Sequence, residues 1–185
     1  MKRLYGVSTH LYHGQRLTRE HLLEIGAQGF DAVELFATRT HFDYHNPAAI
    51  ADLQQWLAEA GLVLHGIHAP IIRAYESGRW VGPLSLASSD EATRELAMAE
   101  TERALHVARR IPVKVLVTHL GYPKTEAAGQ PPDSRAAARR SIEELAPLAK
   151  ALGVTVAVEV IPNEMSRPGS LVHFVEEAAA QPGKE

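Results

Sequence analysis

The chain has 185 residues, of which 45% are hydrophobic and 22% are charged, and its formal net charge is −3. This length allows one domain with a substantial core. The small negative charge argues against nucleic acid as a partner, because proteins that bind nucleic acid usually carry a basic excess or stripe. The absence of cysteine excludes disulfides and thiolate metal sites. No apolar stretch approaches the roughly 20 residues that cross a bilayer, and the first residues lack the apolar segment of a secretory signal. We therefore expect a cytoplasmic protein that does not enter a membrane.

Strand-like and helix-like segments alternate along the chain. The predicted strands are residues 4–8, 32–36, 62–68, 113–118 and 154–160. The predicted helices are residues 18–28, about 47–61, 89–110, 134–152 and 170–180. Pro147 should bend or divide the helix in which it lies. Residues 69–88 are rich in turn formers and too long for a simple connection, which predicts an irregular functional loop over the strand ends.

This alternation predicts an α/β fold with a parallel sheet. The third and fifth predicted strands are almost continuously apolar, as expected where helices cover both sheet faces or where a barrel closes. Right-handed crossovers place the carboxyl ends of all the strands on one side. Active sites of such folds lie on that side.

Three of the predicted strands end in a potential metal ligand. His68 ends the third strand, His119 follows the fourth, and Glu159 lies near the end of the fifth. Two imidazoles and a carboxylate at one sheet edge can hold a divalent cation. The alternative for each histidine is a structural hydrogen bond. The alternative for Glu159 is an ion pair with a lysine or arginine, because a carboxylate within an apolar run is costly to bury unpaired.

Several other residues near the strand ends are weaker candidates. Glu34 could bind a substrate hydroxyl or act as a base, although a structural ion pair explains it equally well. Tyr75 and Trp80 could close over a ligand or simply pack the loop that contains them. Four histidines near the first two strands could line a polar pocket, although each alone is typical of the surface: His10, His13, His41 and His45.

Five sequence strings resemble the xylose isomerase-like TIM-barrel superfamily, which includes sugar phosphate isomerases and epimerases and the endonuclease IV group. They are GFDAVEL at 29–35, HAP at 68–70, LSLAS at 84–88, VTHLG at 117–121 and EVIPN at 159–163. The resemblance covers nearly the whole chain. It implies a parallel (β/α) barrel of TIM type, of which these residues supply about five of eight units, since a complete barrel needs about 250 residues.

The resemblance also implies a divalent-metal site containing zinc, manganese or magnesium. In the endonuclease IV branch, the positions of His68, His119 and Glu159 bind one zinc ion. In the isomerase branch, the position of Glu159 binds a single catalytic cation, and the two histidine positions line the substrate pocket. The family's later ligands, an Asp-x-Gly-His segment, a histidine and a glutamate, are not among the 185 residues. We therefore expect a partial site with little or no isomerase turnover by this chain alone, and open edges at the first and fifth strands that could pair with another copy.

The function expected from this resemblance is metal-dependent isomerisation or epimerisation of a small carbohydrate or sugar phosphate. The reaction would transfer a proton beside a carbonyl. Glu159 would be the metal ligand and catalytic residue, while His68 and His119 would hold the metal or the substrate, and Glu34 the substrate. Two alternatives remain: an endonuclease IV-like zinc phosphodiesterase, and a non-catalytic partial barrel that binds a partner or a small ligand.

Overall fold

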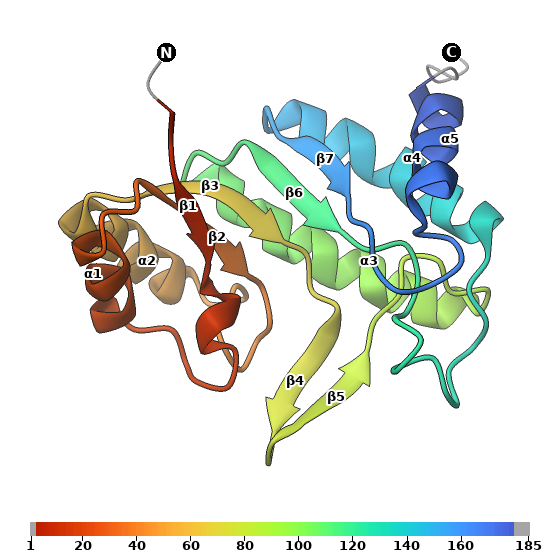
Figure 1. Cartoon of the computed structure of the whole chain (residues 1–185), viewed down its shortest axis with the longest axis horizontal. Helices are drawn as coiled ribbons and strands as arrows, with labels where there is room; N and C mark the ends of the chain where they lie inside the picture. Colours follow the sequence, from red (N-terminus) through yellow and green to blue (C-terminus); the bar gives the residue numbers. More distant parts are fainter. Residues whose placement is uncertain (1–2, 180–185) are drawn as a thin grey trace.

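Five strands form one parallel sheet in the order β1-β2-β3-β6-β7 in the computed structural model, which describes residues 3–179 (Figure 1). In chain order the elements are β1 Gly6–Ser8, η1 Thr9–Tyr12, α1 Arg19–Ala27, β2 Ala32–Phe36, α2 Pro47–Ala60, β3 Val63–His68, β4 Ile72–Glu76, β5 Arg79–Pro83, α3 Glu91–Leu105, η2 His106–Arg109, β6 Val115–Thr118, α4 Arg135–Ala151, β7 Thr155–Val158 and α5 Pro168–Ala179. The expected alternation of strands and helices is confirmed, with boundaries that differ by a few residues.

Local sequence signals set several helix boundaries. The side chain of Asn46 accepts a hydrogen bond from a backbone N–H of the first turn of α2, and Pro47 occupies the first helical position. Gly61 ends α2 in the left-handed conformation, with φ of 67°. Asp90 and Ser134 cap α3 and α4 in the same way as Asn46 caps α2. Within the described residues, no helix has the combination of length and apolar character that spanning a membrane requires.

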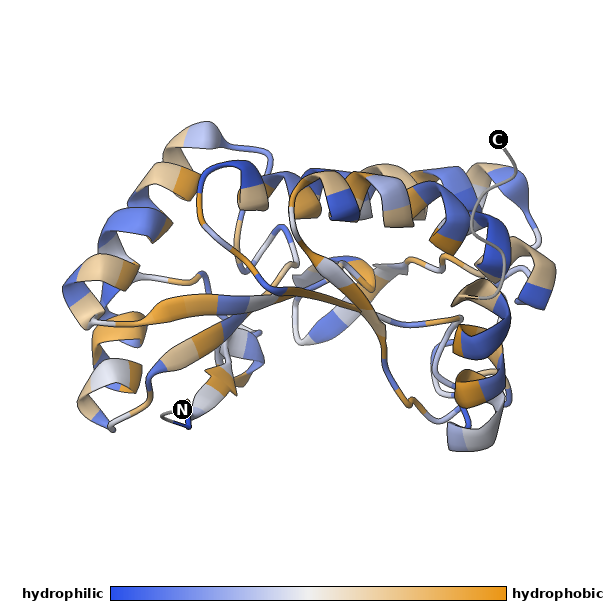
Figure 2. Cartoon of the chain, turned by 90° about the horizontal axis from the view of Figure 1, so that it is seen from above, coloured by the Kyte–Doolittle hydropathy of each residue, from blue (hydrophilic) through white to orange (hydrophobic). Residues whose placement is uncertain are grey.

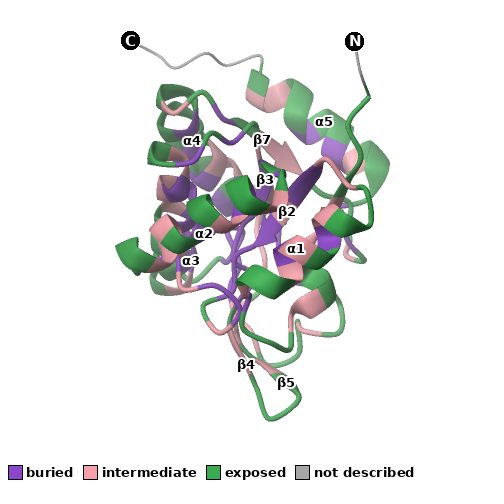
Figure 3. Ribbon diagram, turned by 90° about the vertical axis from the view of Figure 1, so that its left-hand side faces the viewer, coloured by how far each residue is buried: buried purple, intermediate pink, exposed green. Residues whose placement is uncertain are grey.

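The helices cover one face of the curved sheet. Seen from above, they form an arc around the strands, which leaves the opposite face open (Figure 2). Leu35, Ile67 and Leu116 are almost completely buried in the core between sheet and helices. Val115 and Val117 alternate with Leu116 along β6 and are only half-buried, because they line a hollow of about 490 Å³ on the open face. Figure 3 shows the same layering from the side, with buried strands behind the exposed outer surfaces of α1 and α2.

This half-open sheet confirms the expected partial barrel. Each outer strand, β1 or β7, pairs on one side only within residues 3–179. All four strand pairings in the sheet are parallel, so the carboxyl ends of the strands lie along the same edge.

A β-bulge in β3 changes the orientation of its side chains. Val33 pairs with Leu64 but Glu34 pairs with Gly66, so one residue of β3 is left over at this point. Leu64 and Ile67 consequently both lie in the core, although strict alternation would put them on opposite faces. Strict alternation would also put Leu64 and His68 on one face, and the bulge places them on opposite faces.

Residues 69–88 are more regular than the sequence indicated. They contain the antiparallel hairpin β4–β5, which extends beyond the carboxyl edge of the main sheet (Figure 1). Ser77 and Gly78 form its two-residue turn with φ of 50° and 76°, the combination that type I′ hairpin turns need. The expectation of an irregular loop is therefore wrong for residues 72–83, because the tight turn at Ser77 and Gly78 lets the segments on either side pair as strands.

Helix α4 is not divided at Pro147. It continues without interruption from Arg135 to Ala151, with Pro147 inside it. Pro147 is exposed, so its ring is accommodated at the surface and the helix is not divided.

A buried arginine links α3 to α4. Arg94 is only 4% exposed, and its guanidinium donates hydrogen bonds to the Glu91 carboxylate and, at 3.1 Å, to the hydroxyl of Ser141. Glu144 lies 3.2 Å from the same guanidinium. This ion-pair group fixes the packing of the two helices that support β6 and β7.

Candidate metal centre

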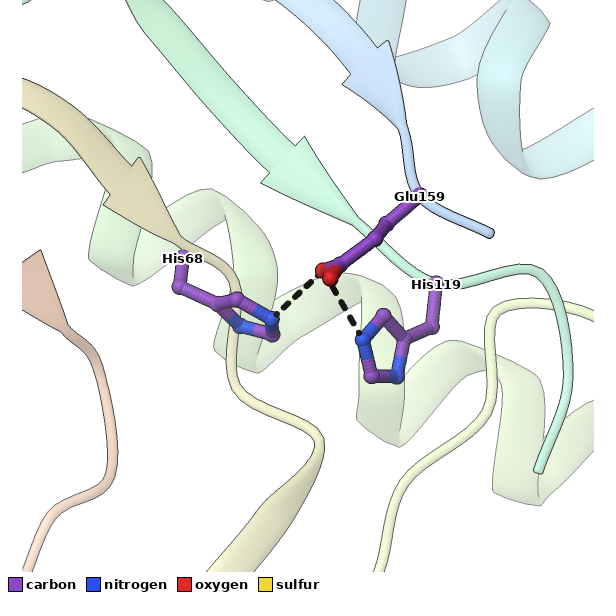
Figure 4. A group of neighbouring side chains, drawn as sticks. All are labelled: His68, His119 and Glu159. Atoms are coloured by element: carbon purple, nitrogen blue, oxygen red, sulfur yellow. Dashed lines mark hydrogen bonds and ion pairs between the residues drawn. The ribbon is translucent and has the colours of Figure 1, made fainter. Parts of the chain in front are cut away.

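His68, His119 and Glu159 meet at the carboxyl edge of the sheet (Figure 4). His68 is the last residue of β3, while His119 and Glu159 directly follow β6 and β7. Because these three strands are neighbours in the sheet, their ends bring the side chains together. A carboxylate oxygen of Glu159 lies 3.3 Å from the Nε2 atoms of both histidines, and one donor atom from each residue fits within 4.8 Å of the others.

Backbone hydrogen bonds hold these positions just beyond the strands. The N–H of Ala69 donates to the carbonyl of Val117 at 2.8 Å, and the N–H of Glu159 donates to the carbonyl of Thr118 at 2.9 Å. The ladder between neighbouring strands therefore continues to the residues that carry the candidate ligands. Their Cα positions are fixed by the sheet and do not depend on a flexible loop.

The second ring nitrogen of His68 is already satisfied. Its Nδ1 lies 2.9 Å from the carbonyl oxygen of Ala69, which orients the ring and leaves Nε2 facing Glu159. Metal-binding histidines commonly donate their other N–H to a carbonyl or carboxylate in this way. Burial lowers the pKa of His68, but the hydrogen bond with Glu159, the Ala69 carbonyl and the charge of Glu34 outweigh it, so the net pKa is raised.

His119 lies in a different environment. Its Nδ1 is buried and has no hydrogen-bond partner among residues 3–179. Burial and the neighbouring His68 lower the pKa of His119 to about 4, against the opposing charge of Glu159. Near neutral pH this imidazole is therefore unprotonated and can offer a lone pair.

Glu159 carries the negative charge of the group. The hydrogen bond with His68 and the nearby imidazoles lower its pKa, although partial burial opposes them, and its side chain remains 46% exposed. Within the described residues its ion-pair partners are His68 and His119. The alternative of an ion pair with lysine or arginine is therefore wrong for this glutamate.

The donor set fits a divalent cation. Zinc binds imidazole nitrogen and carboxylate oxygen at roughly 2.0–2.2 Å, so donors of a tetrahedral site lie about 3.4 Å apart. The two separations of 3.3 Å between Glu159 and the histidines match this spacing. Three protein ligands would leave a coordination position open, which is the arrangement of catalytic zinc sites and not of structural ones.

The structure places Glu34 outside this group. Glu34 lines the hollow on the open sheet face beside Gly66, and its charge helps to raise the pKa of His68. Its expected role in binding substrate stays a prediction.

The other histidine candidates have separate environments. His41 is completely buried and bonded through Nδ1 to the carbonyl of Gln15 at 2.7 Å and through Nε2 to the hydroxyl of Thr9 at 3.1 Å, so its interpretation as a surface residue is wrong. His45 pairs with Glu100 at 3.0 Å. Both contacts are structural and lie apart from the three-residue group.

Four residues that the sequence indicated only as separate candidates, His10, His13, Tyr75 and Trp80, form an aromatic group beside the site. The ring of Trp80 on β5 lies 4.7 Å from that of Tyr75, 4.9 Å from that of His13 and 6.0 Å from that of His10. The hairpin brings these residues from two distant parts of the chain together. The sequence signal for this group is the Ser77-Gly78 turn. A hairpin closed by this two-residue turn pairs Tyr75 with Trp80.

Comparisons with known proteins agree with the partial-barrel fold. The family model described as xylose isomerase-like TIM barrel matches residues 23–181. A search of curated protein sequences found no match. Similar solved structures include a D-psicose 3-epimerase in the presence of D-fructose, with 20% identity, a TM-score of 0.71, and coverage of 95% of this chain and 60% of that protein.

Two further structures hold metals. A xylose isomerase-like TIM barrel protein from Mycobacterium smegmatis in complex with magnesium has 14% identity and a TM-score of 0.70, over 95% of this chain and 61% of that one. The IOLI protein with a binding zinc atom has 13% identity and a TM-score of 0.69, over 96% of this chain and 59% of that one. These likenesses show the fold, and the chain spans about three fifths of each of these proteins. With most of its length matched by the family model, the chain belongs to the xylose isomerase-like TIM barrel family.

Proposed function

We propose that this chain carries part of a metal-dependent sugar isomerase or epimerase site, at which a proton moves beside a carbonyl. The observation that carries the proposal is the convergence of His68, His119 and Glu159 within 4.8 Å of one another at the carboxyl edge of a partial TIM barrel. The shared fold with a D-psicose 3-epimerase supports the reaction class. The magnesium and zinc in two other proteins of this fold support a divalent cation.

Each residue has a distinct role in this proposal. Glu159 supplies an ionised carboxylate, and His68 supplies Nε2 from a ring that the Ala69 carbonyl holds in place. His119 is neutral near pH 7 and lies 3.3 Å from the same carboxylate, so it can complete the ligand set or accept a hydrogen bond from a substrate hydroxyl. A divalent cation held there would polarise the carbonyl and adjacent hydroxyl of the substrate.

The donor types favour zinc or manganese over magnesium. Imidazole suits zinc, whereas magnesium prefers an octahedral set of oxygen ligands and retains several waters. With two imidazoles and one carboxylate, this site offers only one protein residue of the kind that magnesium prefers.

Metal titration by calorimetry tests the proposal. We expect about one zinc or manganese ion per chain and weaker binding of magnesium. His68→Ala and Glu159→Gln should each lower the affinity for zinc at least tenfold, since each removes a donor. Glu164→Gln is the matched control, because Glu164 is 68% exposed and pairs with Lys124 and Arg167. Zinc affinity that is the same in all three variants and in the wild type would refute the site.

Deuterium exchange tests the chemistry separately. An active site of this class would incorporate solvent deuterium at the carbon beside the carbonyl of a ketohexose, which NMR detects. We expect little exchange by this chain alone, because it spans only 60% of the D-psicose 3-epimerase that shares its fold. Rapid exchange that Glu159→Gln abolishes would overturn this expectation of low activity while supporting the reaction class.

A second candidate function is zinc-dependent phosphodiester cleavage. The His-His-Glu donor set favours it, because zinc can lower the pKa of bound water to about 7. No lysine or arginine of the described residues lines the pocket next to His119, which leaves the phosphates without a cationic contact there. Cleavage of abasic DNA by the zinc-loaded protein would favour this candidate over the isomerase.

The open edges of β1 and β7 support a third proposal, in which two copies associate through them. Light scattering after size-exclusion chromatography distinguishes a monomer from such an assembly. A proline in place of Val156, in the middle of β7, should weaken a β7-mediated assembly. A monomer at all concentrations would refute the proposal.

A further inference from the structure

A pocket of about 220 Å³ opens directly beside the candidate metal centre. His119 lines it on the side of the metal centre, and Trp80, Ile71 and Leu84 line it from the hairpin region. Pro123, in the loop after β6, forms part of the opposite wall. Because His119 belongs to both the metal centre and the pocket lining, a molecule bound at the metal centre lies next to this pocket.

The lining of this pocket is mainly apolar. It includes an indole, three aliphatic side chains and two prolines, and no lysine or arginine from the described residues. Its one acidic residue is Glu126. A phosphate group entering here would lose its hydration without gaining a cationic partner and would lie near a carboxylate, which is unfavourable. An uncharged apolar ring would instead exchange water contact for contact with Trp80 and its neighbours.

Hydrogen bonds hold one wall of the pocket rigid. The backbone N–H of Tyr122 donates to Asp133 at 2.7 Å, and the hydroxyl of Ser85 donates to the same carboxylate at 2.6 Å. The side-chain amide of Asn163 donates to the carbonyls of Leu120 and Tyr122 at 2.9 and 3.1 Å. Ser85 belongs to the sequence string LSLAS and Asn163 to the string EVIPN. Of the residues in these two strings, only Glu159 is part of the candidate metal centre. These strings therefore shape the pocket wall before any ligand binds.

Aromatic contacts hold the other wall. Trp80 stacks on His13 with ring centroids 4.9 Å apart and meets Tyr75 edge-on at 4.7 Å. The indole remains half-buried, so part of its surface is available to a ligand. Such a supported ring is the usual partner for a sugar face or an aromatic ring.

The volume of the pocket limits what it can hold. At about 220 Å³ it lies below the roughly 300–1,000 Å³ of pockets that enclose a whole drug-sized ligand. It therefore suits one ring or a short substituent, with the remainder of the molecule at the metal centre.

We propose that this pocket binds an uncharged, apolar substituent of the substrate, such as the aglycone ring of a glycoside whose sugar ring carries a ketone, and selects against phosphorylated sugars. The proposal rests on the proposed function for the carbohydrate end of the substrate. It names Trp80 as a specificity-determining residue and Glu126 as the residue that disfavours phosphate.

Ligand-observed saturation-transfer NMR and tryptophan fluorescence test the proposal. The probes are phenyl β-D-glucopyranoside, D-glucose and D-glucose 6-phosphate, each titrated into the full chain with and without zinc. We expect the phenyl glucoside to bind at least tenfold more tightly than either of the other two. The saturation signal should be strongest at the phenyl protons.

Variants locate the binding. The chain has two tryptophans, so Trp56→Phe leaves Trp80 as the sole reporter and should retain the fluorescence response. Trp56 lines a different pocket and is the matched control. Trp80→Ala should weaken binding of the phenyl glucoside about tenfold, while Trp80→Phe, which keeps a ring, should weaken it less. Glu126→Lys should raise the affinity for D-glucose 6-phosphate several-fold.

Specific results would overturn the proposal. One is D-glucose 6-phosphate binding to the wild type as tightly as the phenyl glucoside. Another is unchanged binding of the phenyl glucoside to Trp80→Ala and Trp80→Phe. The two proposals fail separately: zinc binding without phenyl glucoside binding refutes the pocket, whereas phenyl glucoside binding without any metal binding refutes the metal-dependent function.

Discussion

The lowered pKa of His119 predicts that the metal-free protein loses stability in acid. Burial and the neighbouring His68 lower this pKa from 6.5 to about 4. The unfolded chain takes up a proton on His119 below pH 6.5, whereas the folded chain takes it up only near pH 4, so falling pH favours unfolding across this window. Since one unit of pKa difference corresponds to about 1.36 kcal/mol, the loss relative to pH 8 is about 2 kcal/mol at pH 5 and about 3 kcal/mol at pH 4.

His68 acts in the opposite direction. Its pKa is raised above 6.5 by Glu159 and the Ala69 carbonyl against the effect of burial, so protonated His68 stabilises the fold. That contribution is complete below pH 6.5 and is lost as pH rises through the raised pKa. The free energy of unfolding that the wild type loses in acid is therefore smaller than the loss that His119 alone would cause. A His119 variant is needed to measure the contribution of His119 by itself.

Urea unfolding in the presence of a chelator measures the effect. We expect His119→Gln, which retains a polar side chain that does not titrate, to lose about 2 kcal/mol less stability than the wild type between pH 8 and pH 5. His173→Gln is the control, because the His173 side chain is 67% exposed, and it should behave like the wild type. The same loss in His119→Gln as in the wild type would show that burial of His119 does not govern acid stability.

Three further predictions concern stability and are checked by thermal or urea unfolding. Gly121 and Gly129 both have positive φ, but a Cβ atom would clash with the Asp133 carboxylate only at Gly121. Gly121→Ala should therefore lower the free energy of unfolding by at least about 1 kcal/mol more than Gly129→Ala does. Pro147→Ala should stabilise the protein by about 1 kcal/mol or more, because it removes an exposed proline from the interior of α4. Arg94→Met should cost about 2 kcal/mol through lost charged hydrogen bonds, whereas loss of Arg140, which is 49% exposed, should cost under about 1 kcal/mol.

The sequence was sufficient to predict that His68, His119 and Glu159 lie together because of how parallel sheets are built. Each of His68, His119 and Glu159 ends or follows an apolar strand, and right-handed crossovers bring all such ends to one edge. Their actual contact also depends on β3, β6 and β7 being neighbours, which is a property of the strand order. Since β4 and β5 leave the sheet as a hairpin, β3 and β6 become adjacent and the two imidazoles meet.

Other features could not be derived from periodicity because they depend on local departures from it. The bulge in β3 inserts one residue between the positions paired with Val33 and Glu34, and no apolar pattern marks such an insertion. Without the bulge, His68 would lie on the same face as Leu64, in the core and away from Glu159. The bulge that interrupts the alternation of side chains along β3 is therefore also what places His68, a candidate ligand, beside Glu159.

The apolar pocket illustrates a different limit. Its walls come from the β4–β5 hairpin and the loop after β6, and the hydrogen bonds of Asp133 and Asn163 hold the backbone around Tyr122 in the second wall. The string EVIPN includes Asn163, but it does not show that the amide of this residue bonds to the backbone and leaves apolar side chains to line the pocket. The shape of the pocket is therefore a property of tertiary structure, whereas the meeting of His68, His119 and Glu159 follows from strand topology.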